Sequence, residues 1–485
     1  MPDLLHALQG HDFGYLRIVA ELWGVELDAT EEDTARRELA ASLLDADLVS
    51  EIVETLPDEA RTALRDLVAG EGRVPWATFV RRFGEVREMG PGRRDREKPH
   101  HAPASITEVL FYRALVARAF FDASGGPQEF AYIADDLLPL VAAALGARDG
   151  EDVSPEPFGR PASPRDRAHI FPADDTILDD ACTLLAALRM GREGLSPHAT
   201  RVPETVLRDL LTAAGLLDED GTPRPEAVRL FLEAPRHEAL SSLVTAWHAS
   251  RTFNELRHVP GLVCEGEWAN DPLSTRQILL RFLESVPRGE WWDLRSFVAS
   301  VRERYPDFQR PAGDYDSWFV RRVVDGEYLR GFEHWDEVDG ALIRYVITGP
   351  MHWLGLTDLA TGEEGESPAA FRLTFDPASL RSGEFAFPVT AQESPIRLTS
   401  RGRIEVPRLA SRAARYQIAR FCEWDASKGE MYAYHVTPRS LARAARQGLK
   451  VVHLLAVLKQ HTAAPLPPTF VRALKRWEAK GTEAR

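Results

Sequence analysis

The order of structural signals that follows the first 55 residues constrains the fold more than any other feature of the sequence. Apolar residues at helical spacing predict one helix that begins near Pro57 and a second that begins near Trp76. A third helix is expected to begin at Ser105, which opens a capping-box pattern, and to continue to Val116. A glycine-proline turn then precedes a strand-like segment at 129–133. Three helices closed by a β-hairpin are typical of a winged helix, a relative of the helix-turn-helix.

A similar order recurs further along the chain. A predicted helix at 205–213 ends in Gly-Leu-Leu and a hairpin turn signal, and another helix follows. A third unit begins with a helix at Thr275, continues through a tryptophan pair into a second helix, and ends with the strand-like segment 341–347. The sequence shows no self-similarity at a fixed period of 20–50 residues, so a solenoid is not expected. We therefore predict tandem winged-helix-like modules.

The C-terminal part of the sequence mixes strand and helix signals. A hairpin is expected to turn at 400–402, and four helices are expected after it, at 410–421, 438–447, 451–461 and 468–480. The predicted fold class is mainly α (α+β), with tandem winged-helix-like modules followed by a small α/β C-terminal domain. Stretches rich in proline, glycine or glutamate suggest these parts: an N-terminal helical segment (1–55), module 1 (56–144), a linker (145–166), module 2 (167–262), module 3 (270–360), a second linker (360–368) and a basic C-terminal domain (368–485).

Length and composition indicate a globular protein of several domains. The 485 residues are 44% hydrophobic and 27% charged, which excludes a disordered chain. No apolar run reaches the roughly 18 residues that cross a bilayer, and the N-terminus lacks the regions of a signal peptide. Three widely spaced cysteines argue against a disulfide framework and against a cysteine zinc site. We therefore expect a cytoplasmic protein with no membrane partner, and association with the nucleoid is compatible with this expectation.

The charge is distributed unevenly along the chain. The net charge is −15, but residues 401–485 contain 17 Lys and Arg against 6 Asp and Glu, a net charge of +11. The other 400 residues therefore carry a net charge of −26. A basic tail on an acidic body suggests a polyanionic partner or an acidic protein partner at the C-terminal end. The alternative is a basic surface that contacts only solvent.

The first candidate for nucleic-acid contact is a basic stretch in module 1. Glycine and proline interrupt it, so a flexible loop is expected directly before the predicted helix at Ser105. Its candidate residues are Arg93, Arg94, Arg96 and Lys98. Flexible basic loops supply contacts with phosphates that do not depend on base sequence. The alternative is an ordered loop whose arginines pair with the interspersed acids Glu85, Glu88, Asp95 and Glu97.

The second candidate lies in the C-terminal domain. Its residues are Arg401 and Arg403 in the predicted hairpin, and two rows at helical spacing, which are Arg408, Arg412 and Arg415, then Arg439, Arg443, Arg446 and Lys450. Like charges along one helix face repel by about 0.2–0.5 kcal/mol per neighbouring pair, and an anionic partner would remove that cost. The alternative is a solvated face whose arginines complement the helix dipole.

The sequence contains none of the common motifs for catalysis or cofactor binding. It has no G-x-S-x-G elbow, no H-E-x-x-H or paired C-x-x-C zinc motif and no glycine-rich dinucleotide fingerprint. His100 and His101 are adjacent and are therefore expected to point in different directions, which disfavours a metal site. The acidic pairs 174–175 and 179–180 are expected to be solvated or to lie at helix starts. We expect no enzyme, no cofactor and no metal, with a nuclease site assembled from distant acids as a third hypothesis.

The C-terminal sequence carries a run of features that resembles a known family. Residues 404–481 contain a strand leading into Val-Pro, an amphipathic helix ending in ARFCEW, the run YHVTPRSLARAARQGL, a helix pair around LLAVLKQHTAAPLPP and a closing ALKRW. They resemble the helicase-associated domain of XPB-type DNA helicases and of related bacterial proteins, and the segment from Glu327 is similar to that of the bacterial members. The resemblance implies a winged-helix, DNA-interacting architecture and a helicase or DNA-repair context.

The motor of such helicases is absent from this sequence. There is no G-x-x-x-x-G-K-[ST] phosphate loop and no Asp-Glu-Ala-His metal motif. The chain therefore looks like the accessory, non-motor region alone. The hypothesis is a non-catalytic DNA-binding or helicase-associated accessory protein in DNA repair, transcription or genome maintenance, which binds double-stranded or forked DNA and has a helicase or another protein as a further partner. The alternative is a protein–protein interaction scaffold built on winged helices.

Overall fold

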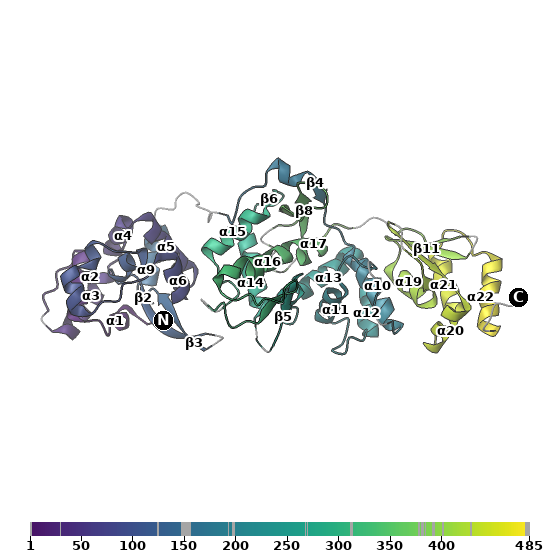
Figure 1. The fold of residues 1–485 in the computed structure, drawn as a ribbon, viewed down its shortest axis with the longest axis horizontal. Coiled ribbons are helices and arrows are strands. Elements are labelled where there is room, and N and C mark those ends of the chain that lie inside the picture. The colour runs from purple at the N-terminus through teal and green to yellow at the C-terminus, as the bar shows by residue number, and fades with distance from the viewer. Residues whose placement is uncertain are drawn as a thin grey trace. The chain divides into compact units, whose positions relative to one another are not determined.

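The computed structural model of the chain divides into two units (Figure 1). Unit 1 comprises Met1–Pro157 together with Val301–Ser317, and unit 2 comprises Phe158–Ser300 together with Trp318–Arg485. The structure describes residues 2–480 except 30, 124–125, 147–156, 193, 196–198, 267, 269, 311–313, 377–378, 380–382, 384, 390–392, 400–401 and 427–428. Helices predominate, with small antiparallel sheets, which confirms the predicted mainly α (α+β) fold class. No helix in this part of the chain is long and apolar enough to cross a membrane.

Unit 1 is a helical unit with one small sheet. Its helices are α1 (Leu4–Ala7), α2 (Phe13–Trp23), α3 (Glu32–Leu43), α4 (Ala46–Thr55), α5 (Asp58–Ala69), α6 (Trp76–Phe83), α7 (Pro91–Glu97), the 3-10 helix η1 (Pro99–His101), α8 (Ile106–Phe111) and α9 (Leu138–Gly146). Its strands are β1 (Arg73–Pro75), β2 (Ala117–Ala123) and β3 (Gly126–Tyr132), in the sheet order β1-β3-β2. The predicted helix starts and the predicted hairpin are confirmed, since β2 pairs antiparallel with β3.

The third predicted helix is shorter than expected. The Ser105 hydroxyl accepts the Glu108 amide at 3.0 Å and begins α8, as the capping pattern predicts. The helix nevertheless ends at Phe111. Ala114 has a positive φ of 53°, which a right-handed helix does not accommodate. The prediction that this helix continues to Val116 is therefore wrong, and the β-compatible residues after Val116 pair with β3 instead.

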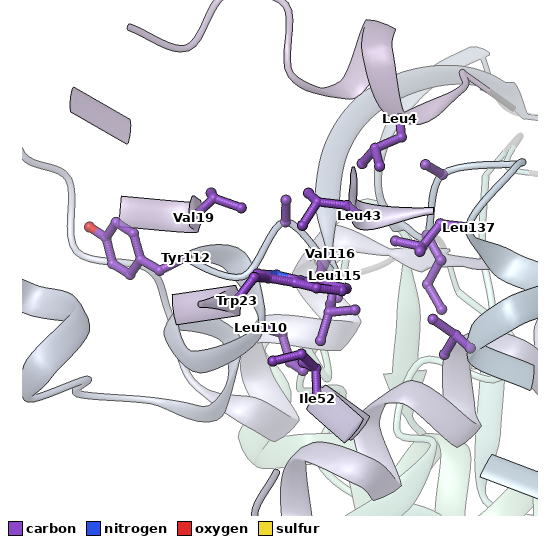
Figure 2. Packing of buried hydrophobic residues seen from close by; sticks show 14 of the residues in the cluster. Leu4, Val19, Trp23, Leu43, Ile52, Leu110, Tyr112, Leu115, Val116 and Leu137 are labelled. Atoms are coloured by element: carbon purple, nitrogen blue, oxygen red, sulfur yellow. The ribbon is translucent and has the colours of Figure 1, made fainter. Parts of the chain in front are cut away.

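One hydrophobic core runs through unit 1. Figure 2 shows the Trp23 ring at its centre, among apolar side chains from α3, α4, α8 and the segment before β2. The indole of Trp23 donates to the Arg113 carbonyl at 2.8 Å, and the Tyr15 hydroxyl donates to the Phe111 carbonyl at 2.6 Å. The N-terminal helices and the segment from α5 to α9 therefore share a single core.

The first part of unit 2 combines helices with two small antiparallel sheets. Its helices are η2 (Pro164–Arg167), α10 (Ile177–Arg189), α11 (Glu204–Ala213), α12 (Pro225–Glu233), α13 (Arg236–Ala249), η3 (Glu255–His258), α14 (Pro272–Leu283), α15 (Leu294–Arg304, whose last turn belongs to unit 1), η4 (Phe332–His334), α16 (Trp335–Thr348) and α17 (Pro350–Trp353). Its strands are β4 (His169–Phe171), β5 (Leu262–Cys264), β6 (Trp292–Asp293), β7 (Val320–Arg322), β8 (Thr357–Thr361) and β9 (Ala370–Leu373), in the orders β4-β8-β9-β6 and β5-β7.

Two segments of the chain follow the same topology. In unit 1 the order is α5, β1, α6, α8, β2 and β3, with α7 and η1 inserted before α8, and the sheet order is β1-β3-β2. In unit 2 the order is α14, β6, α15, α16, β8 and β9, with β7 and η4 inserted before α16 and α17 inserted before β8, and the neighbouring strands are β6-β9-β8. In both, a short strand lies between the first two helices and pairs with the second strand of a C-terminal hairpin.

Three local predictions in unit 2 are wrong. The segment 341–347 lies in α16 rather than in a strand, because Leu342, Ile343, Val346 and Ile347 recur at helical spacing and bury one face of that helix. The second predicted linker is the turn of a hairpin, since β8 continues to Thr361 and the Ala369 amide donates a hydrogen bond to the Ala360 carbonyl at 2.9 Å. The last part of the first predicted linker packs against unit 2 instead of running free, because Phe158 packs on Phe282 and the Ala162 amide donates to the Trp291 carbonyl. Residues 147–156 of that linker lie outside the described residues.

The C-terminal part of unit 2 follows its sequence-based prediction closely. It contains β10 (Arg397–Leu398), β11 (Arg403–Pro407), α19 (Arg412–Phe421), β12 (Glu423–Trp424), β13 (Met431–His435), α20 (Pro438–Arg446), α21 (Val451–His461) and α22 (Pro468–Lys480). The strands form one antiparallel sheet in the order β10-β11-β13-β12. The predicted hairpin is β10–β11, and the four predicted helices begin and end within two residues of the expected positions.

Candidate nucleic-acid interface

The three C-terminal helices carry charge of almost one sign. Residues 437–480 contain nine Lys and Arg but a single acid, Glu478. The carboxylate of Glu478 accepts the backbone amide of Val451 at 2.7 Å, so this carboxylate binds the first amide of α21. These helices therefore hold an excess of cations that acids within the same segment do not neutralise.

Helix α20 turns two of its cations outward. Thr437 and Ser440 form a reciprocal capping box and Pro438 occupies the first turn, so the start of the helix is fixed. The helix buries Leu441 and Ser440 and leaves Arg439 and Arg446, two turns apart, exposed. The predicted row is thus split, and neither of these two arginines forms an ion pair with a residue that the structure describes.

Arg443 and Lys450 complete that row in different ways. Arg443 is half-buried and donates to the Glu423 carboxylate at 3.1 Å and to the Cys422 carbonyl at 2.9 Å. It therefore fastens α20 to the sheet and is a weak candidate for an external ligand. Lys450 is exposed at the start of α21, where its ammonium group can reach solvent or a partner.

Helix α22 adds cations that the sequence interpretation did not select. Arg472, Lys475 and Arg476 are exposed, while Leu474 is buried against the domain. Helix α22 contacts both α20 and α21 (Figure 1), so its exposed cations lie on a helix next to the two that carry the others. We name the exposed set the α20–α22 cationic surface, which comprises Arg439, Arg446, Lys450, Lys459, Arg472, Lys475 and Arg476. The signal that could have found the additional residues was the near absence of acids after residue 430.

The row formed by Arg408, Arg412 and Arg415 does not face solvent, and its prediction as an exposed contact stripe is wrong. Arg412 and Arg415 are only 4% and 2% exposed. Arg412 donates to the carbonyls of Phe231 and Ala234, at 3.0 and 2.7 Å. These side chains face α10 and α12, because α19 packs between those two helices on one side and α20 and α21 on the other.

Arg415 is enclosed on all sides. It donates to the Asp179 carbonyl and, at 2.7 Å, to the Thr183 hydroxyl. Its guanidinium group lies 3.8 Å from the centre of the Tyr432 ring, a cation–π contact. An external polyanion cannot reach this group without unpacking α19 from α10.

The acids expected to be solvated are the partners of these arginines. Asp179 is fully buried and accepts Arg236 at 2.7 Å, with Arg408 at 3.5 Å. Asp175 accepts Arg236 at 2.5 Å and also pairs with Arg408. Burial alone would raise the pKa of Asp175, but the two guanidinium groups outweigh it and lower that pKa. Asp179 and Asp180 lie in the first turn of α10, so the prediction of a helix start is confirmed for this pair. They are not solvated, because both are buried and Arg236, Arg408 and Arg415 surround Asp179.

Asp180 has a different environment from its neighbour. Its carboxylate oxygen Oδ2 accepts the backbone amides of Arg201 and Val202, at 2.9 and 3.0 Å. Burial raises the pKa of Asp180 to about 6, against the effect of these amides, and the charge of Asp179 adds to the rise. Burial likewise lowers the pKa of Arg412 to about 10, so the side chain is charged at neutral pH.

Of the two predicted hairpin residues, the structure describes Arg403. Arg403 lies on β11, is half-buried, and has the Asp425 carboxylate 3.5 Å from its Nε, so it does not belong to the α20–α22 cationic surface. Arg401 lies outside the described residues.

The basic stretch of unit 1 is ordered, so the prediction of a flexible loop is wrong. Most of it forms α7 and η1. Arg94 is buried and pairs with Asp12 and Asp95, both at 2.7 Å, and Arg93 pairs with Glu97 at 2.9 Å. The alternative of arginines paired with interspersed acids therefore holds for these two. Arg96 and Lys98 are exposed and form no ion pair within the described part of the chain.

The helix that follows this stretch does not present a reading face. Four of the six residues of α8 are buried, from Thr107 to Leu110. The buried Glu108 carboxylate accepts the Arg87 guanidinium at 2.7 Å and the Ala104 amide at 2.7 Å. Helix α8 therefore does not act as a recognition helix, since its side chains complete the core instead of reaching outward.

No family model matches this chain, and no curated protein matches it significantly. The functional argument therefore depends on the residues themselves. Of the surfaces described above, the α20–α22 cationic surface has the greatest excess of exposed cations and comes from adjacent helices.

Proposed function

We propose that this chain is a non-catalytic nucleic-acid-binding protein that contacts the phosphates of DNA through the α20–α22 cationic surface. The observation that carries the proposal is the ratio of nine cations to one acid over residues 437–480, with the acid already engaged at a helix end. Cations crowded on neighbouring helices repel one another, and a polyanion relieves that repulsion while releasing its own counterions.

The repeated topology supports a DNA-related role for the rest of the chain. The order helix, strand, helix, helix and hairpin, which recurs in each unit apart from short insertions, is the order expected of a winged helix, and on that ground we propose that both segments belong to this class. Together with the resemblance of the tail to the helicase-associated domain, this assignment supports an accessory role beside a helicase in DNA repair, transcription or genome maintenance. The cytoplasm, or the nucleoid within it, is the compartment that this role requires.

The expected binding mode is backbone recognition. Arginine and lysine on short exposed helices can reach phosphates, whereas the helix of unit 1 that would read bases is buried. Affinity should therefore depend weakly on base sequence and strongly on salt, with a slope of log K against log salt of about −0.9 for each phosphate neutralised.

The test is fluorescence anisotropy of the full chain on duplex and forked DNA of mixed sequence, across a salt series. The variant R439A/R446A/K475A removes three cations of the surface, and we expect its salt slope to be smaller in magnitude by about 3. The control is R37A/R251A/R288A, which removes the same charge from exposed positions elsewhere. The proposal fails if the unaltered chain does not bind at low salt, or if the two triple variants bind equally.

A protein-interaction scaffold is the second candidate, and an exposed apolar cluster favours it. Residues beside and after β7 leave large apolar side chains in solvent, namely Phe319, Val323, Val324, Tyr328 and Phe332, with Val324 90% exposed. Such clusters are typical of protein contact sites. Crosslinking of the full chain in nuclease-treated lysate would favour this candidate if a partner is captured through residues 319–332 while DNA affinity is absent.

A further inference from the structure

A second group of residues that could bind a ligand lies in unit 1, away from the cationic surface. Asp12 caps α2 by accepting the Tyr15 amide at 2.9 Å, and the same carboxylate accepts Arg94 of α7 at 2.7 Å. This pair fastens α7 to the start of α2. The next turn of the chain, η1, then places two adjacent histidines near Glu21, which projects from the last turns of α2.

His100 and His101 converge on the same carboxylate. Nε2 of His100 lies 3.8 Å from one oxygen of Glu21, and Nε2 of His101 lies 3.5 Å from the other. The three ligand atoms lie within 4.8 Å of one another, and the two imidazole rings are 4.2 Å apart at a tilt of 44°. The prediction that adjacent histidines point in different directions is wrong here, because a tight 3-10 turn rather than a regular strand or helix carries them.

The buried histidine lacks the hydrogen bonds that its burial requires. The His100 side chain is 3% exposed, and neither ring nitrogen has a hydrogen-bond partner among the described residues. A buried polar group without a partner carries the full penalty of its desolvation, so an unpaired imidazole needs an explanation. Its Nε2 points toward Glu21 across a separation too long for a hydrogen bond.

We propose that Glu21, His100 and His101 bind a divalent transition-metal ion, with Zn²⁺ as the expected ion. Zinc takes imidazole nitrogen and carboxylate oxygen at about 2.0–2.2 Å, which places neighbouring ligand atoms about 3.3 Å apart in a tetrahedron. The two measured separations, 3.8 and 3.5 Å, run to different oxygens of the Glu21 carboxylate, so the side chains must rotate to bring one oxygen and both imidazole nitrogens around the same ion. Three protein ligands leave a fourth position for water or for a group from a partner.

The surroundings of the site are compatible with a cation. Among the nearby cations, Arg94 is neutralised by the carboxylates of Asp12 and Asp95, and Arg96 and Lys98 are exposed, where solvent screens their charge. Glu21 and His101 are 55% and 52% exposed, which leaves an entry path from solvent. The inference does not rest on the proposed nucleic-acid function, because none of its residues belongs to the α20–α22 cationic surface.

The experiment measures Zn²⁺ binding to the full chain after chelator treatment and dialysis, by competition with a chromophoric chelator. Co²⁺ serves as a second probe, because its visible absorption reports tetrahedral nitrogen and oxygen ligands. We expect one equivalent per chain. The variants E21Q and H101A should each weaken binding by more than about 100-fold, since the loss of even an outer-shell partner costs about 10- to 100-fold.

The control variant is H6A. His6 is an exposed histidine of the same unit that already pairs with a carboxylate, Asp3, at 2.6 Å, so its loss matches H101A in side chain and exposure. Both E21Q and H101A alter exposed side chains, and the thermal unfolding curves of the metal-free proteins verify that they fold. The proposal is overturned if the unaltered chain takes up no stoichiometric Zn²⁺, or if E21Q and H101A bind it as tightly as H6A does.

Discussion

At the scale of single residues, burial separates the arginines that can bind a ligand from those that hold the fold together. Arg412, Arg415, Arg439 and Arg446 all follow helical spacing in the sequence, and the spacing correctly places each pair on one helix face. The spacing does not tell which face another element covers. The end of α12 covers Arg412 and α10 covers Arg415, and both helices lie more than 170 residues earlier in the chain.

The pKa of Asp180 gives a prediction at this scale. In the folded protein this pKa is about 6, above the ordinary 3.8. Between pH 3.8 and 6 the folded state therefore keeps the Asp180 carboxyl protonated, whereas the unfolded state does not. The stability of the protein consequently falls as the pH rises through this range. The variant D180N cannot ionise, and its carboxamide oxygen can accept the same two amides. Above pH 6 we expect the free energy of unfolding of D180N to exceed that of the unaltered chain by on the order of 1–2 kcal/mol. Urea unfolding curves measure this difference.

The comparison between two pH values contains its own control. Near pH 4 the unaltered Asp180 is protonated in the folded state, so the two proteins should then be equally stable. The prediction is contradicted if D180N is less stable than the unaltered chain by the same free energy at pH 4 and at pH 8. Such a difference would be purely structural, because it would not depend on pH.

At the scale of secondary structure, the elements that the sequence predicts best have explicit start and stop residues. Helix α20 is an example, since Thr437, Pro438 and Gly448 mark its ends in both the sequence and the structure. The segment at 341–347 lacked such markers. Its mostly apolar run, interrupted by Arg344, suits a buried helix and a buried strand equally well, and packing in unit 2 decides between them.

The cap of α20 gives a prediction at this scale. The variant T437A removes the side chain that accepts the Ser440 amide at 2.9 Å, and we expect the loss of about 1 kcal/mol of local stability. Hydrogen exchange of α20 should accelerate accordingly. The variant T437S keeps the hydroxyl and should exchange like the unaltered protein, whereas equal acceleration in both variants would show that the cap is not the cause.

At the scale of the whole molecule, unit 1 is not continuous in sequence. Residues 301–317 return to it after more than 140 residues of unit 2. The Asp307 carboxylate, 5% exposed, accepts Arg81 at 2.7 Å, Thr78 at 3.0 Å and the Tyr315 hydroxyl at 2.5 Å. No local sequence pattern predicts this return, because it depends on contacts between residues more than 200 positions apart.

The Asp307 contacts give a prediction at this scale. The variant D307A leaves three donors of unit 1 without their acceptor, and we expect unit 1 to lose about 2 kcal/mol. Hydrogen exchange should rise in α6, while α11 and α13 keep their rates. The control D316A removes an exposed acid nearby and should leave both regions unchanged. Equal protection of α6 in D307A and D316A would mean that the returning segment does not stabilise unit 1.

The buried ion pairs between α10 and α19 have a practical consequence for anyone who shortens this protein. A chain ending before residue 393 would lose Arg408 and Arg415, so Asp175 and Asp179 would share Arg236 as their guanidinium partner and the apolar face of α10 would be uncovered. Such a fragment should aggregate or misfold, and any binding activity lost with it would be mistaken for a ligand contact. Dissection of this molecule therefore requires point substitutions on its exterior, with the polypeptide left intact.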